Sequence, residues 1–60
     1  MGRTREEILR IIEEQEGHKR SAQSIISHTN SPIARDGAYE VIANVDANIE
    51  ALKEELAGLN

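Results

Sequence analysis

The chain has 60 residues, a formal net charge of −4 and no cysteine. This length allows one domain, and the lack of cysteine excludes disulfides and thiolate metal sites. No apolar run approaches the ~20 residues that a membrane span needs, and the first residues lack the apolar core of a signal peptide. We therefore expect a single cytoplasmic domain over residues 1–60, with no membrane segment.

The first predicted helix covers about residues 5–28. Thr4 and Glu7 form a capping-box pattern, in which each side chain bonds the other residue's backbone N–H. Apolar residues then recur at helical rather than strand spacing, at Ile8, Ile11, Ile12, Ala22, Ile25 and Ile26. Gln15 and His18 occupy the same stripe. The pattern predicts an amphipathic helix that begins at a defined residue.

Gly17 is the weak point of this helix. A glycine can end a helix, and Ser21 is a suitable cap for a new one. However, the apolar stripe stays in phase across the glycine, and Glu16 stands four residues before Arg20, the favoured order for an ion pair. These observations favour one continuous helix, with a kink at Gly17 as the alternative.

The second predicted helix covers about residues 32–57 and follows a turn at residues 29–31. Asn30 tolerates the left-handed conformation that ends many helices. Ser31 is a suitable N-cap and Pro32 suits the first helical position. Apolar residues continue at helical spacing to Leu56, and Gly58 then has the position of a C-terminal cap.

Two helices of similar length, joined by a short turn, predict an all-α fold: an antiparallel helical hairpin. Each helix has one apolar stripe, so we expect two hairpins to pair into a dimeric four-helix bundle. The predicted oligomer core is Ile8, Ile12, Ala22, Ile26, Val41, Val45, Ile49, Leu52 and Leu56. Gln15, His18 and Asn48 are predicted to form a polar layer that fixes the register and the oligomeric state.

The segment HTNSPI, from His28 to Ile33, resembles the phospho-accepting box of sensor histidine kinases. The resemblance implies phosphotransfer through His28 in a dimeric helical hairpin. In those boxes the proline comes five residues after the histidine and an acidic residue follows the histidine. Here Pro32 comes four residues after it and Thr29 takes the acidic place. We therefore interpret the segment as a turn, with His28 outside the apolar stripe.

The charges are unevenly divided between the two helices. The seven cations include a group at Arg3, Arg5 and Arg10, with Arg20 further along, whereas the second helix is rich in acids. Plasmid copy-number regulators of the Rop kind are similar in length, layout and net acidity, and the resemblance implies RNA binding. This gives the alternative function: an RNA-binding hairpin regulator that uses the arginines of the first helix.

The sequence has no nucleophile paired with a base, no glycine-rich phosphate loop and no cluster of metal ligands. We therefore expect neither an enzyme nor a cofactor. The favoured function is a non-catalytic protein-interaction module, an adaptor, regulator or inhibitor that acts as a homodimeric helical bundle. Its expected partners are a second copy of the chain and another protein.

Overall fold

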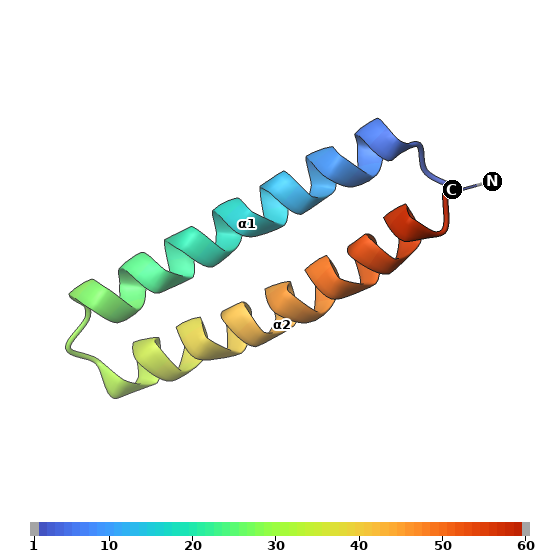
Figure 1. Cartoon of the computed structure of the whole chain (residues 1–60). Coiled ribbons are helices and arrows are strands. Elements are labelled where there is room, and N and C mark those ends of the chain that lie inside the picture. Colours follow the sequence, from blue (N-terminus) through green and yellow to red (C-terminus); the bar gives the residue numbers. More distant parts are fainter. Residues whose placement is uncertain (1, 60) are drawn as a thin grey trace.

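The computed structural model describes residues 2–59, and its regular structure is helical (Figure 1). Helix α1 spans Arg5–His28 and helix α2 spans Pro32–Ala57. The helices run antiparallel along each other, with the turn at one end and the start of α1 and the end of α2 at the other (Figure 1). The resulting rod measures 45 × 15 × 15 Å. This confirms the predicted two-helix hairpin, and neither helix is long and apolar enough to cross a membrane.

Both helices begin at the predicted capping residues. The hydroxyl of Thr4 accepts from the N–H of Glu7 at 3.2 Å, and the carboxylate of Glu7 accepts from the N–H of Thr4 at 3.0 Å. At α2 the hydroxyl of Ser31 accepts from the N–H of Ala34 at 3.2 Å, with Pro32 in the first turn. These bonds satisfy amide groups that have no acceptor within the helix.

Helix α1 continues through Gly17 without a break. A side chain at this position would meet only the guanidinium of Arg20, at 3.9 Å, so the glycine fills no steric need. The ion pairs among residues 2–59 join Arg3 to Glu55 and Lys19 to Asp46. The expected pair of Glu16 with Arg20 is therefore absent, and helix continuity does not depend on it.

The turn differs from the expected left-handed cap at Asn30, because residues 2–59 contain no positive φ. Instead Thr29 ends α1 in an extended conformation, at φ −94° and ψ 145°. Its hydroxyl accepts from the N–H of Ser31 at 3.1 Å, and its carbonyl accepts from the guanidinium of Arg35 at 3.2 Å. Ser31 precedes a proline, which restricts it to extended conformations. Extended backbone and a threonine hydroxyl thus close the turn.

Helix α2 ends at Gly58, which keeps right-handed angles of φ −72° and ψ −11°. The left-handed cap that is common at such glycines is not formed here. The N–H of Gly58 donates to the carbonyl of Glu54 at 3.1 Å, and the N–H of Leu59 donates to that of Leu56 at 3.1 Å. The helix ends by tightening its last turn, and this arrangement does not require a glycine.

The hairpin core is a narrow line of side chains between the helices. In α2 the line runs at seven-residue spacing, and in α1 its buried members are fourteen residues apart, with Gln15 half-buried between them. The buried residues of the line are Ile8, Ala22, Ala38, Val45 and Leu52. Large side chains fill it near the termini, whereas alanines fill it near the turn. The turn half therefore holds less apolar volume.

Candidate functional site

The residues beside the core line form two flanks of the hairpin. Residues three positions after a core residue lie on one flank, and residues four positions after it lie on the other, because each residue advances about 100° around a helix. We call the first the +3 flank; Ile11, His18 and Ile25 of α1 lie on it. The second, the +4 flank, includes Ile12 and Lys19. The two flanks differ in how completely they are covered.

The +4 flank is closed by apolar packing and one ion pair. Its apolar members are buried or half-buried: Ile12, Ile26, Ile42, Ile49 and Leu56. The ammonium of Lys19 bonds the carboxylate of Asp46 at 2.7 Å across the two helices. These residues leave little apolar surface uncovered next to the core line, whereas Leu9 and Tyr39, farther round the helices on the same side, are 46% and 55% exposed.

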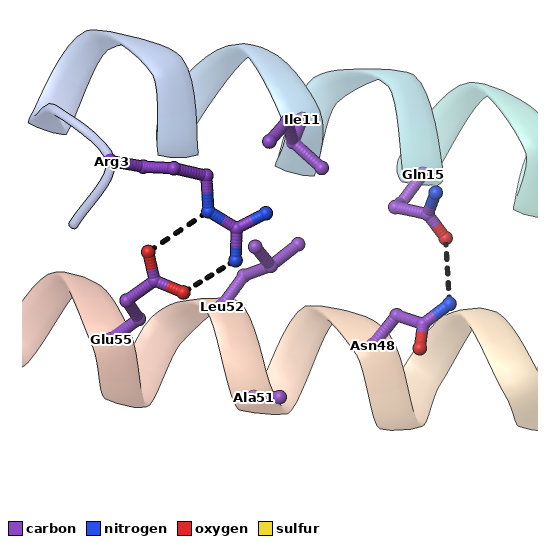
Figure 2. A pocket seen from close by; sticks show the side chains of 7 residues that line it. All are labelled: Arg3, Ile11, Gln15, Asn48, Ala51, Leu52 and Glu55. Atoms are coloured by element: carbon purple, nitrogen blue, oxygen red, sulfur yellow. Dashed lines mark hydrogen bonds and ion pairs between the residues drawn. The ribbon is translucent and has the colours of Figure 1, made fainter. Parts of the chain in front are cut away.

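The +3 flank has a polar half near the chain termini (Figure 2). The guanidinium of Arg3 donates two hydrogen bonds to the carboxylate of Glu55, one of them 3.0 Å long. Further along, the amide nitrogen of Asn48 donates to the amide oxygen of Gln15 at 3.3 Å. Figure 2 shows both pairs bridging from the α1 side of the hairpin to α2 across a shallow pocket. Two polar pairs thus bridge the hairpin at the surface of this half, and Ile11, Ala51 and Leu52 line the pocket with them.

Two carboxylates near the termini are stabilised in their charged form. The hydrogen bonds from Arg3, helped by its positive charge, lower the pKa of Glu55 and in turn raise the pKa of Arg3. The backbone N–H and the hydroxyl of Thr4 lower the pKa of Glu7. Arg3, Glu7 and Glu55 lie at the end of the hairpin opposite the turn, and none of them is buried away from water.

The turn half of the +3 flank is an apolar groove. Its eight lining residues are His18, Ser21, Ala22, Ile25, Ala34, Gly37, Ala38 and Val41. Ile25 is 48% exposed and Val41 is 43% exposed, although both lie on the predicted stripes. The groove is open because alanines, a serine and a glycine replace the bulky residues that would fill it. No acidic residue, lysine or arginine lines it.

Two of the three residues predicted for the polar layer lie within hydrogen-bonding distance of each other. Gln15 and Asn48 meet, whereas His18 is exposed and lines the apolar groove instead of the Gln15–Asn48 pocket. Gln15 is half-buried and Asn48 exposed, so the pair lies at the edge of the core. His18 is one helical turn nearer the hairpin turn, which separates it from the pair.

The predicted oligomer core divides into three groups within one hairpin. Five of its residues are buried: Ile8, Ala22, Val45, Ile49 and Leu52. Ile12, Ile26 and Leu56 are half-buried, and Val41 is exposed. Ala38, outside that set, is buried at 4% exposure. The exposed Val41 marks the place where one hairpin leaves apolar surface uncovered.

His28 occupies the last turn of α1 and is exposed, as the turn interpretation predicts. Its Nδ1 lies 2.8 Å from the carbonyl oxygen of Ser24, which only accepts, so this ring nitrogen is the donor. The imidazole thus donates to a backbone carbonyl one turn back in its own helix. Its contacts are those of a helix-end residue.

The four arginines singled out from the sequence are not equivalent. Arg3 is bound to Glu55, whereas Arg5, Arg10 and Arg20 are exposed. The spacing of these three places them in different directions around α1 rather than in one line. The sequence did not reveal the partners of Arg3 and Lys19, because these ion pairs depend on how the two helices align. Arg35 bonds the backbone carbonyl of Thr29, and a carbonyl leaves no signal in the sequence.

The chain matches no protein-family model, no curated protein and no solved structure at a significant level.

Proposed function

We propose that this chain is a small non-catalytic protein-interaction module that works as a homodimeric helical bundle, in the role of an adaptor, regulator or inhibitor. The proposal is supported above all by apolar side chains that a single hairpin leaves in water. Ile25 and Val41 are nearly half exposed although the helical period assigns them to the interior stripes. Burying such side chains is the main favourable contribution to association.

The surface area supports the same proposal. One hairpin exposes 4569 Å². A folded monomer of this mass, 6.7 kDa, is expected to expose about 3,900 Å². The excess, about 670 Å², follows from the rod shape, because two helices alone cannot enclose a core. Association with a second hairpin buries part of this exposed surface.

Sedimentation equilibrium over a concentration series tests the assembly. We expect a reversible transition from monomer to dimer, with helical circular dichroism rising as dimer forms. A helical monomer at every concentration would overturn the proposal.

The interaction role needs a second experiment. The immobilised chain is used to capture proteins from its source cells, and a variant that sedimentation equilibrium shows to be monomeric serves as the control. We expect a partner that is retained by the dimer and lost with the monomeric variant. If the chain instead shifts labelled RNA at low salt, with affinity that falls as salt rises, the RNA-binding function replaces this one.

A further inference from the structure

We infer that the apolar groove of the +3 flank is the surface that receives the second copy of the chain, with the turn half of one hairpin covering the turn half of the other. The inference rests on the proposed homodimer and adds the face and the half of the hairpin that form the contact. The other flank, which Lys19 and Asp46 bridge, is left facing solvent.

The distribution of apolar surface selects the flank. The apolar residues of the +4 flank are buried or half-buried. On the +3 flank Ile25 and Val41 are 48% and 43% exposed and line a groove together with small and apolar residues. Covering the +3 flank therefore removes both side chains and the apolar lining of the groove from water in one contact.

The residues that line the groove also favour a second copy of the chain as the partner that binds there. A twofold dimer uses the same patch on both copies, so the patch must be compatible with itself. The groove is lined by apolar and small residues and by the single histidine, without a carboxylate or a basic chain. Each copy carries a net charge of −4, yet its acids lie outside this contact. A second groove thus meets the first without burying like charges.

Size and shape agree with this occupant. The excess surface of the hairpin, about 670 Å², is close to the ~800 Å² that each partner buries in a typical stable interface. Small residues at Ser21, Ala34 and Gly37 allow the backbones of facing helices to approach closely.

The polar half explains why the turn halves overlap. Near the termini the +3 flank presents the Arg3–Glu55 and Gln15–Asn48 pairs, whose members are hydrogen-bonded to each other within the hairpin. Placing an apolar groove on these groups would remove them from water with no new partner. The free energy of association is most favourable when apolar surface covers apolar surface. This requires the two turn halves to contact each other.

Two matched pairs of lysine variants test this inference by sedimentation equilibrium, with circular dichroism as the check on folding. Ile25→Lys puts a charge in the groove, and Leu9→Lys makes a similar change at a residue of closely similar exposure, 46% against 48%, that does not line the groove. Ser21→Lys and Gln23→Lys place the charge on opposite sides of the buried Ala22. Ser21 and Gln23 are both exposed, so neither change disturbs the core of the hairpin.

We expect Ile25→Lys and Ser21→Lys to weaken dimerisation by about a hundredfold or more, because each dimer would bury two charges. The two control variants should stay within about threefold of the wild type, since their side chains remain in water. A dimer that tolerates the groove variants, or one that the controls disrupt, would overturn the assignment of the face while the homodimer stands. A wild-type chain that remains monomeric would overturn both proposals. If Ile25→Lys fails to fold, the Ser21→Lys and Gln23→Lys pair decides.

Discussion

Gln15 of α1 and Asn48 of α2 join the two helices through a hydrogen bond of 3.3 Å between their side-chain amides. Gln15 lies on the core line midway between Ile8 and Ala22, where an apolar residue would be expected. A polar side chain at such a position lowers stability but restricts how helices align, because alternative alignments leave its amide without a partner. The pair therefore favours one register over others.

We predict that Gln15→Leu raises the free energy of unfolding by about 1 kcal/mol, because it exchanges one modest hydrogen bond for apolar burial. The melting temperature should rise by about 5 °C for a domain of this size. The same variant should lose its single oligomeric state, seen as several species in sedimentation. Asn48→Ala is the control, since it removes the bond without adding apolar volume and should lower stability slightly. A less stable Gln15→Leu variant that keeps one oligomeric state would contradict the prediction.

The helix caps should contribute measurably to stability. Thr4→Ala and Ser31→Ala each leave a backbone N–H of the first helical turn without its side-chain acceptor, and each should cost about 1 kcal/mol. Thermal unfolding followed by circular dichroism provides the measurement. Thr4→Ser keeps the hydroxyl and should retain most of the stability. Equal losses in the serine and alanine variants would show that the hydrogen bond is not the cause.

The hairpin could be predicted from local signals in the sequence, whereas its open flank could not. Thr4, Ser31 and Pro32 marked where helices begin, and helical spacing of apolar residues indicated which faces meet. Both flanks carry apolar residues at that spacing, so the pattern alone could not tell the covered flank from the open one. The +3 flank differs in having the small residues Ser21, Ala34 and Gly37 beside the core line, and Ile25 and Val41 stay at the surface there. Small side chains next to the core line, rather than the hydrophobic period, distinguish the groove.

The turn and the cross-helix contacts needed the folded arrangement as well. Asn30 was the residue expected to adopt left-handed backbone, but Thr29 closes the turn through its hydroxyl. Similarly, Arg3 and Glu55 are 52 positions apart in sequence and meet only because the helices align along their full length. Long side chains reach partners several positions away, so sequence spacing alone does not identify such pairs.

Stability should fall in acid because Glu7 and Glu55 have lowered pKa values in the folded chain. The folded state binds these protons more weakly than the unfolded chain does. The stabilisation is therefore present above the ordinary glutamate pKa, about 4.3, and is lost as the pH falls through that value towards the lowered ones. Melting temperatures measured across this range should show the decline.

Two variants check the source of this acid sensitivity. Glu7→Gln keeps the capping box, since glutamine also serves there, but it removes the titrating group. Glu55→Gln removes the ion pair with Arg3. Both should show a smaller loss of stability in acid than the wild type. Curves parallel to that of the wild type would assign the acid effect to other carboxylates.

Two glycines offer a comparison that separates the stability of the hairpin from dimerisation. Gly17 and Gly37 both lie within helices, and a methyl group at either position meets no backbone or core atom, with only the end of Arg20 within 4 Å of the first. Alanine at each should therefore stabilise its helix by about 1 kcal/mol. The two positions differ in their surroundings: Gly37 lines the apolar groove, and Gly17 does not.

If the groove receives a second copy, only Gly37→Ala places its methyl group between facing helices. Gly17→Ala should raise the melting temperature and leave the dissociation constant of the dimer unchanged. Gly37→Ala should change that constant, because an added methyl group either fills space at the contact or pushes the facing helix away. Sedimentation equilibrium of the two variants measures this difference. Identical dissociation constants for the two variants would place Gly37 outside the contact. A helix packed closely on the groove would be affected by a methyl group added to the groove at Gly37.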